Sequence, residues 1–435
     1  MTVASQWESD WPIGRLKNAL AVPVTDGPHS TPEFMAEGVP FLSVDAIQDG
    51  ELVFAGCRYV SSEDHADFVR KARPHMNDLL MGKAASTGKI ARVKTSTEFS
   101  IWSPLALIRI NETLADPGFI EYCLKSPECQ FEIDGYSNAN TQKNIGMGDI
   151  PRISLPLPTL AIQATVARFL DGETAQIDQL IAKQERLIAL LAEKRQAIIT
   201  HAVTKGLDPT APTKPSDIPW LGDIPAGWGA SRMSYEVWVR ARLGWKGLKA
   251  EEYVLDGVAF LSTPNIKGRD IDFKDVNRIS QDRFEESPEI KLSLGDVVLA
   301  KDGSTLGTVN VVRELPEPAT VNSSIAVLTP SPSIDGVYLF YLLQSDYLRH
   351  TIQLLKGGMG VPHLFQDDIR RFQLSLPSIS EQVAIAGHLD RKTQRIDQLI
   401  AKVQLAVGLL AERRSALISA AVTGKIDVLA GASKP

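Results

Sequence analysis

The heptapeptide IDQLIAK occurs at residues 177–183 and again at 396–402, 219 positions later in a chain of 435 residues. The match extends far beyond seven residues, without a gap through the following stretch. The same offset aligns LLAE (190–193) with LLAE (409–412), AVT (202–204) with AVT (421–423), and GVPFLSVDAI (38–47) with GVAFLSTPNI (257–266). Because an internal repeat governs every other assignment, we treat the chain as a tandem duplication, copy one followed by copy two.

The residues around the two heptapeptides predict a long helix in each copy. Apolar or small residues recur every third or fourth position over several turns, which is typical of a coiled-coil seam and not of a strand. Gln184, aligned with Val403, is the polar residue expected on this seam, where it would help to set the register. The predicted seam positions are Ile177, Leu180, Ile181, Leu187, Leu191, Ile198, Ile396, Leu399, Ile400, Val403, Leu410 and Leu417.

The length of the first helix depends on the Asp171-Gly172 step, which is a potential break. From Thr174 to Thr204 the helix would be roughly 45 Å long, and continuation through residues 161–170 would bring it to about 65 Å. Gly206 is the predicted stop signal. Because a long apolar seam needs a partner, we expect the two helices to pack antiparallel about a pseudo-twofold axis. The alternative is two unrelated surface helices.

The segments upstream of each helix are less alike and mix short β-type runs with turn signals. In copy two, DVVLA (296–300) and TVNVV (308–312) flank a turn and predict a hairpin, SIAVLTP (324–330) predicts a strand, and residues 337–355 predict one helix. The predicted fold class is therefore α+β: two α+β domains separated by two long antiparallel coiled-coil helices, with an internal pseudo-twofold duplication.

Composition is ordinary for a globular protein, with a net charge of −6 and a pI near 5.8. This acidic balance is unusual for a nucleic-acid binder, although basic residues gather locally. Three cysteines without CxxC spacing argue against a disulfide framework or a zinc site. We find no run of about 18 apolar residues and no basic-then-apolar leader. A reducing cytoplasm is the expected location.

The sequence contains no convincing catalytic motif. GKAASTGK (82–89) has one residue too many for a phosphate loop, and Ile90 replaces the hydroxyl residue that would hold magnesium. Glu289-Ile290-Lys291 has an E-x-K shape that arises freely by chance. The seven histidines show no HExxH spacing. We therefore expect no bound metal, no cofactor and no catalytic residue in this chain.

Two diverged α+β modules, each followed by a similar long helix, resemble the specificity (S) subunits of type I restriction–modification systems. The residues that carry the resemblance are LDGETAQIDQLIAKQERLIALLAEKRQAIITHAVTKGLDP (170–209), LDRKTQRIDQLIAKVQLAVGLLAERRSALISAAVTGKIDV (389–428), WLGDIPAGW (220–228) and GDVVLAKDGSTLGTV (295–309). The resemblance covers nearly the whole chain.

The resemblance implies that each diverged module is a target-recognition domain that reads one half of a split, asymmetric DNA site. The helices would set the gap between the half-sites and dock two methyltransferase (M) subunits, with ATP-driven restriction (R) subunits in the full complex. S-adenosylmethionine, ATP and Mg²⁺ would belong to those partners, and the complex would methylate adenine and cleave DNA. No membrane partner is implied.

The resemblance also suggests domain boundaries. They are 1–158 for the first recognition domain, 159–207 for the central helical spacer, 208–227 for a linker, 228–377 for the second recognition domain, 378–427 for the C-terminal helical spacer and 428–435 for a tail.

Candidates for DNA contact are polar residues in loops that coincide between the copies, together with local basic clusters. Thr141–Asn144 coincides with Gly360–Leu364, and residues 83–89 coincide with 301–305. Lys or Arg suits guanine, and Asn or Gln suits adenine. The candidates are Lys83, Ser86, Thr87, Lys89, Arg92, Gln142, Lys143, Asn144, Lys267, Arg269, Lys301, Asp302, Ser304, Thr305 and His363.

Two other functions remain open from the sequence. A duplicated scaffold or adaptor, presenting two modules on a coiled coil, would show no sequence-dependent DNA binding with any partner. A stand-alone enzyme would be active as the purified chain.

Overall fold

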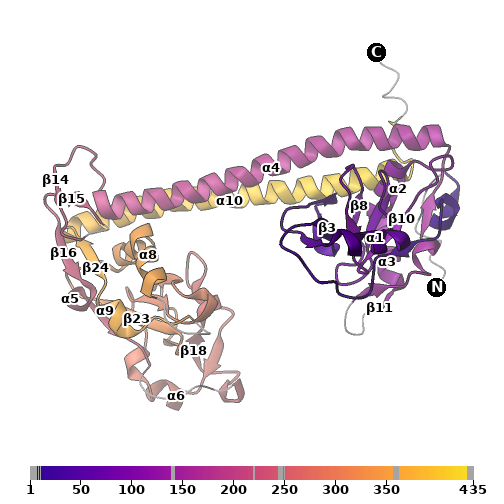
Figure 1. The fold of residues 1–435 in the computed structure, drawn as a ribbon. Coiled ribbons are helices and arrows are strands. Elements are labelled where there is room, and N and C mark those ends of the chain that lie inside the picture. The colour runs from indigo at the N-terminus through magenta and orange to yellow at the C-terminus, as the bar shows by residue number, and fades with distance from the viewer. Residues whose placement is uncertain are drawn as a thin grey trace. The chain divides into compact units, whose positions relative to one another are not determined.

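The computed structural model describes residues 7, 9, 11–138, 143–218, 221–242, 248, 250–355 and 362–428. These residues form two compact units. Unit 1 consists of residues 1–185 and 405–435, and unit 2 consists of residues 186–404. Each unit therefore contains one α+β domain and a part of both long helices, α4 (Leu160–Lys205) and α10 (Ile379–Val422) (Figure 1).

In unit 1, a four-stranded and a three-stranded sheet form the main part of the α+β domain, beside shorter two-stranded pairs. One sheet has the strand order β2-β10-β7-β8, and the other has the order β6-β3-β9 with β3 and β9 parallel. The strands are β1 (Ile13–Arg15), β2 (Thr25–Asp26), β3 (Val39–Leu42), β4 (Ile47–Gln48), β5 (Glu51–Leu52), β6 (Arg58–Val60), β7 (Leu79–Gly82), β8 (Ile90–Arg92), β9 (Ser100–Ile101), β10 (Leu105–Ile108), β11 (Ser137–Asn138), β12 (Asn144–Ile145) and β13 (Ser154–Pro156). The helices are α1 (Ser62–Lys71), α2 (Pro117–Lys125) and α3 (Pro127–Tyr136).

Unit 2 repeats this topology. Its sheets have the orders β17-β23-β20-β21 and β19-β18-β22, with β18 and β22 parallel. The strands are β14 (Thr213–Pro215), β15 (Asp223–Pro225), β16 (Gly229–Arg232), β17 (Val237–Arg240), β18 (Val258–Leu261), β19 (Asn277–Ile279), β20 (Val297–Ala300), β21 (Val309–Val311), β22 (Ala319–Val321), β23 (Ile325–Pro330) and β24 (Gln373–Leu376). The helices are α5 (Met233–Glu236), α6 (Gln281–Glu285), α7 (Gly336–Leu343), α8 (Asp346–Leu355) and α9 (Gln366–Arg370).

The predicted fold class is confirmed, including the hairpin of β20 and β21 and the strand β23. One local prediction is wrong, because residues 337–355 form two helices, α7 and α8, and not one. Ser345, which is fully buried, ends the first helix by donating to the Leu342 carbonyl and accepts from the Leu348 amide at the start of the second. Ser126 stands at the same place between α2 and α3.

Helix α4 runs through the Asp171-Gly172 step without a break and ends at Lys205, before Gly206 at φ +78°. A glycine inside a helix costs about 1 kcal/mol relative to alanine. That cost is small beside the burial of Leu170, which is fully inaccessible, and Thr174, whose hydroxyl donates to the Leu170 carbonyl at 2.6 Å. Tertiary packing therefore outweighs the local propensity at this step.

Both helices carry a heptad stripe of buried or half-buried residues, and near the domains further positions such as Val166 and Ile199 are buried as well. In α4 the stripe consists of Gln163, Ala167, Leu170, Thr174, Ile177, Ile181, Gln184, Ile188, Leu191, Arg195, Ile198 and Ala202. The same classes recur in α10 at positions 219 residues later, so the predicted residues Ile396, Ile400, Val403, Leu410 and Leu417 also lie on the seam. Gln184 is not the only polar seam residue, because Gln163, Thr174 and Arg195 share it.

Three predicted seam residues lie outside the seam. Leu180 is 45% exposed, Leu187 is 41% exposed and Leu399 is 43% exposed. The residues that follow them in the chain, Ile181, Ile188 and Ile400, take the inward positions of the heptad. Where two neighbouring residues are both apolar, the pattern alone does not say which one faces inward.

In each unit, the pairing of the helices is antiparallel and carries the same ion pair. In unit 1, Arg414 of α10 donates to Asp178 of α4 at 2.8 Å. In unit 2, Arg195 of α4 donates to Asp397 of α10 at 2.9 Å. The offset of 219 converts one pair into the other with the helices exchanged, so equivalent residues make the same contact in each unit.

Each domain core closes on the helix ends that belong to its own unit. In unit 1, Val166 and Leu170 of α4 and Ile418 and Val422 of α10 are buried in one cluster with Phe119 of α2. In unit 2, the corresponding cluster is built from Ile199, Val203, Ile385 and Leu389 together with residues of α7. The seam therefore continues into the hydrophobic core of each domain.

This packing makes a prediction about two leucines of α4 in unit 1. Leu170→Ala should lower the free energy of unfolding by about 2–5 kcal/mol, because it removes a fully buried side chain from the shared core. Leu180→Ala, the matched control, should change it by less than about 0.5 kcal/mol. Urea unfolding followed by circular dichroism measures both. Equal losses for the two variants would contradict the assigned seam.

Candidate nucleic-acid interface

In unit 1, the loop between β7 and β8 lies against the segment that enters β12. Ala84 and Asn144 form an antiparallel β-bridge, and the Ile145 amide donates to the Lys83 carbonyl at 2.9 Å. The Thr87 hydroxyl donates to the Lys143 carbonyl at 2.8 Å. Two segments that are distant in sequence therefore form one polar surface.

Unit 2 repeats the arrangement between the β20–β21 loop and the segment before α9. Asp302 and His363 form an antiparallel bridge, and the Leu364 amide donates to the Lys301 carbonyl at 2.8 Å. We call these two surfaces the paired loops of unit 1 (83–89 with 143–145) and of unit 2 (301–305 with 362–364). Of the predicted segments, Thr141, Gln142, Gly360 and Val361 lie outside the described residues.

In unit 1, a buried carboxylate fixes the lysine at the base of the paired loops. Asp26, which is 5% exposed, accepts from Lys71 at 2.5 Å and lies 2.9 Å from the Lys83 ammonium, with His29 at 3.2 Å. Burial alone would raise the pKa of Asp26, but the two lysines outweigh it and hold that pKa below its usual 3.8. Lys83 is thereby held at one place beneath the loop.

In unit 2, the carboxylate that binds the lysine belongs to the paired loops themselves. Asp302 accepts from Lys301 at 2.8 Å and also binds the Nδ1 atom of His363. The His363 ring packs edge-on against Phe365 with centroids 4.4 Å apart, and Phe365 is 57% exposed. The sequence reasoning missed Phe365, Asp26 and Lys71 because none of them belongs to a basic cluster or coincides between the copies.

The paired loops differ in what they offer to a base edge. In unit 1, Lys143 and Asn144 are exposed, and Ser86 and Thr87 are half-buried. Lysine suits guanine acceptors and asparagine can form two hydrogen bonds with adenine. In unit 2, Ser304 is exposed, while Lys301, Asp302, Thr305 and His363 are half-buried. A carboxylate accepts from the cytosine amino group, so the two surfaces present different donors and acceptors to a base edge.

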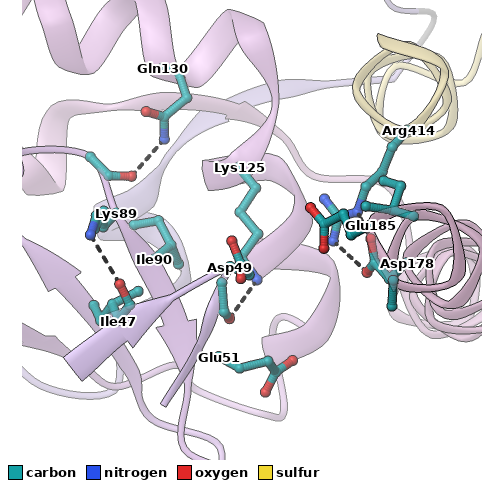
Figure 2. Close-up of a pocket in the computed structure, with 14 residues that line it drawn as sticks. Ile47, Asp49, Glu51, Lys89, Ile90, Lys125, Gln130, Asp178, Glu185 and Arg414 are labelled. Carbon is teal, nitrogen blue, oxygen red and sulfur yellow. Dashed lines mark hydrogen bonds and ion pairs between the residues drawn. The ribbon is translucent and has the colours of Figure 1, made fainter. Parts of the chain in front are cut away.

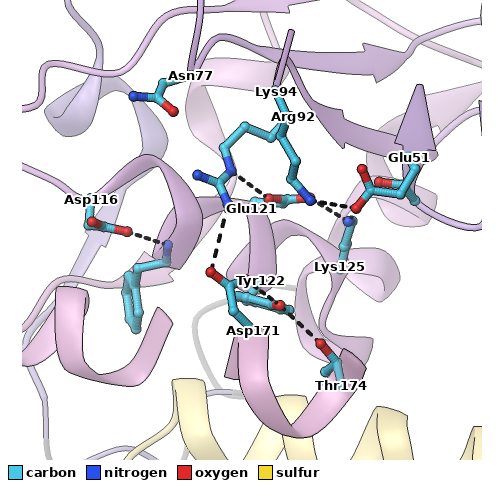
Figure 3. Close-up of polar contacts among 12 residues, drawn as sticks. Glu51, Asn77, Arg92, Lys94, Asp116, Glu121, Tyr122, Lys125, Asp171 and Thr174 are labelled. Atoms are coloured by element: carbon cyan, nitrogen blue, oxygen red, sulfur yellow. Dashed lines mark hydrogen bonds and ion pairs between the residues drawn. The ribbon is translucent and has the colours of Figure 1, made fainter. Parts of the chain in front are cut away.

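Three candidates lie away from the paired loops, and Lys89, the last residue of the unit 1 loop, turns its side chain to the domain backbone. Arg92 donates to Glu121 at 2.9 Å and lies 3.9 Å from Asp171 of α4, and its side chain is 18% exposed (Figure 3). Lys89 donates to the Ile47 carbonyl at 3.1 Å. Lys267 and Arg269 are exposed beside the unit 2 helices. The structure therefore separates the side chains of these four residues from those of the other candidates.

A duplicated hydroxyl network fastens each domain to its helix. The Tyr122 hydroxyl donates to Asp171 at 2.8 Å and lies 3.1 Å from the Thr174 hydroxyl (Figure 3). In unit 2, Tyr341 donates to Asp390 at 2.7 Å and lies 3.1 Å from Thr393. Burial, aided by the acceptor carboxylates, raises the pKa of both tyrosines. Tyr122, Asp171 and Thr174 align with Tyr341, Asp390 and Thr393 at the offset of 219. This identity between the copies is the sequence signal that could have identified the network.

Within the described residues, no group of three or more His, Cys, Asp or Glu side chains is placed to hold a metal ion. Over the same residues, no helix combines the length and the apolar character that crossing a membrane requires.

The comparisons with known proteins agree with this geometry. Residues 257–406 match the model of the type I restriction modification DNA specificity domain. The type I restriction enzyme MjaVIII specificity subunit of Methanocaldococcus jannaschii is 24% identical over 427 residues, which cover 96% of this chain and 93% of that protein. The EcoBI specificity subunit of Escherichia coli is 24% identical over 309 residues, 68% of this chain and 64% of that protein.

A solved structure shares the fold. A chain from a study of complex assembly and conformational transition of the type I R-M system superposes with a TM-score of 0.71 at 17% identity, covering 96% of this chain and 98% of that one. The fold shared with that chain has two α+β domains on two long helices, and residues 257–406 of the second copy match a DNA specificity domain. Over 96% of its length, this chain is similar to a type I restriction enzyme specificity subunit.

The Asp26 cluster makes a prediction about pH. Asp26→Asn should lower the free energy of unfolding at neutral pH by about 1–3 kcal/mol, because two lysines lose a charged acceptor. Since the folded pKa of Asp26 lies below 3.8, this contribution is complete above that pH and is lost as pH falls below it. The difference between wild type and variant should therefore shrink only under acid conditions.

Urea unfolding of wild type and Asp26→Asn over a pH series measures this difference. Asp67→Asn is the matched control, because that carboxylate is 63% exposed in a surface ion pair with Arg70. The control should cost at most about 0.5 kcal/mol at any pH. A wild type-to-Asp26→Asn difference that disappears near neutral pH would contradict the assigned cluster.

Proposed function

We propose that this chain is the DNA sequence-specificity subunit of a type I restriction–modification complex and reads a split, asymmetric site with its two domains. The observation that carries the proposal is the repetition of the paired loops on the same topology with different side chains. Asn144 in unit 1 is replaced by His363 in unit 2 at the bridge position. Two domains that recognise different bases require the same backbone framework with different polar side chains on it.

The helices contribute the repeated part of the proposal. Most of their seam residues and their Arg–Asp pairs are the same in both copies, as expected if each copy binds the same kind of partner. We propose that two methyltransferase subunits dock there, that restriction subunits join the full complex, and that the helices set the gap between half-sites. A non-DNA scaffold would not require different polar side chains at the two paired loops.

The chemistry belongs to the partners in this proposal. S-adenosylmethionine would be bound by the methyltransferase subunits, and ATP and Mg²⁺ would be used by the partners in adenine methylation and DNA cleavage. The residues of this chain bind and orient DNA. The cytoplasm, where the host DNA lies, is the proposed location.

Substitutions in the paired loops should change one half-site at a time. Asn144→Ala should relax the sequence requirement in the half-site read by unit 1, because one good base contact contributes about 1–3 kcal/mol of discrimination. His363→Ala should relax the other half-site. Methylation of a randomised DNA library by the chain reconstituted with its methyltransferase, followed by sequencing, measures both effects.

Two controls define this experiment. Asn277→Ala changes an exposed amide on β19, outside both paired loops, and should leave both half-sites unchanged. The reciprocal half-site of each variant is an internal control. Relaxation of both half-sites by either variant alone would contradict the assignment of one domain to one half-site.

The acidic balance of the chain predicts weak DNA binding without partners. With a net charge of −6, the isolated chain should neutralise few phosphates, so its affinity should be low and should fall further with added salt. Addition of the methyltransferase should raise the affinity. Fluorescence anisotropy with a labelled duplex at several salt concentrations measures this. Tight, salt-insensitive binding by the chain alone would contradict the proposed division of phosphate contacts.

A further inference from the structure

One turn differs in charge between the two domain–helix junctions although it stands at the same aligned place in both copies. The turn in copy one reads Gln48-Asp49-Gly50-Glu51, and the aligned turn in copy two reads Lys267-Gly268-Arg269-Asp270. The first is acidic and the second carries two basic side chains. Apart from the half-buried Gly50, all these residues are exposed.

The same backbone bond closes both turns, although the chain follows a different local path within them. The Val53 amide donates to the Ala46 carbonyl at 2.9 Å in copy one, and the Asp272 amide donates to the Asn265 carbonyl at 2.9 Å in copy two, 219 residues later. In copy one the turn is the tip of the β4–β5 hairpin, with Asp49 and Gly50 at positive φ, whereas in copy two it follows a 3₁₀ turn at Thr263–Ile266. The change of charge therefore stands at the same place in the two domains, on turns of different local backbone.

In unit 1, this turn faces the helices across a hollow of about 720 Å³. Figure 2 shows Asp49 and Glu51 of the turn on one side and Asp178, Glu185 and Arg414 of the helices on the other. The two lysines on the domain side of this hollow bind backbone carbonyls of the domain. Lys125 donates to the Gly50 carbonyl at 3.0 Å, and Lys89 donates to the Ile47 carbonyl. Four acidic and three basic side chains line the hollow.

In unit 2, the aligned turn faces the helices across a smaller hollow of about 250 Å³. Here neutral Asn310 donates to the Gly268 carbonyl at 3.1 Å, so no lysine is used to hold the turn. Lys267 and Arg269 stand beside the ion pair of Arg195 with Asp397 and beside Arg313. Four basic and two acidic side chains line this hollow.

We propose that the two junctions are unequal docking sites for two copies of one partner subunit. The inference rests on the proposed function, in which identical methyltransferase subunits bind the helices of both units. Each hollow is walled by the helix face carrying the shared Asp–Arg pair, so a subunit on that face meets the turn as well. One partner surface cannot complement an acidic and a basic turn equally.

The consequence is ordered assembly. One junction attracts the partner and fills first, whereas the other binds it more weakly. Surface charge interactions are screened by salt, with a Debye length of about 10 Å at 0.1 M and about 3 Å at 1 M. The inequality between the two binding steps should therefore shrink as the salt concentration rises, whichever sign the partner carries.

Titration of the full chain with its methyltransferase subunit, followed by native mass spectrometry at several salt concentrations, gives both stepwise dissociation constants. We expect their ratio to exceed the statistical ratio of identical sites by at least about tenfold at low salt, and to approach it at high salt. Lys267→Gln with Arg269→Gln should move the ratio toward the statistical value. Gln48→Lys with Asp49→Gly in unit 1 should also move the ratio toward the statistical value. Glycine suits the φ of +50° at position 49.

The matched control is Lys274→Gln with Arg371→Gln, which removes the same charge from exposed positions of unit 2 outside the hollow and should leave the ratio unchanged. Two equal intrinsic dissociation constants in the wild type would overturn this inference without contradicting the proposed function. An inequality between the two constants that neither salt nor the turn variants change would do the same. A change in DNA affinity with no change in the ratio would overturn it in favour of phosphate contact by the turn. Absence of any partner binding would contradict the proposed function itself.

Discussion

Each recognition domain depends on a two-helix seam that it does not build alone. The seam in unit 1 needs Leu170 from the start of α4 and Val422 from the end of α10, which are separated by most of the chain. Two helices can bury only one narrow face against each other, so the middle seam positions remain half-exposed. Full burial occurs where a domain adds its own core to the pair.

The polar contacts follow from the same arrangement. Tyr122 and Tyr341 place their hydroxyls on Asp171 and Asp390, so that each domain is attached to its helix by a directional bond as well as by apolar contact. A buried hydroxyl without a partner would cost about 1–3 kcal/mol, so these contacts specify one orientation of the domain on the helix. The two copies share this attachment, whereas the side chains of their paired loops differ.

The sequence predicted the parts of the fold that the repeat makes visible. The offset of 219 identified both helices, their antiparallel relation and most seam residues, because heptad burial leaves a periodic mark on the sequence. It could not choose between Leu180 and Ile181, since both are apolar and only the packing decides. It also missed the break at Ser345, where a single capping hydroxyl outweighs a long apolar run.

The candidate site was less predictable, because its geometry depends on contacts between distant segments. Coincidence between copies singled out the loops that contain Lys83 and Asn144, and the structure brings them together. Nothing in the sequence joined Lys83 to Asp26, or placed Arg92 beside Asp171 of α4. Local basic clusters are therefore poor guides here, since their partners are set by the tertiary fold.

The proposed role of this chain is to choose the DNA sequence at which its partners act. Single-molecule sequencing of host DNA for methyladenine, with and without the gene for this chain, tests that role most directly. A split, asymmetric motif should be methylated in the wild type and unmethylated after deletion, and its methylation should return when the gene is restored. Methylation of the same split motifs in the presence and absence of the gene would contradict it.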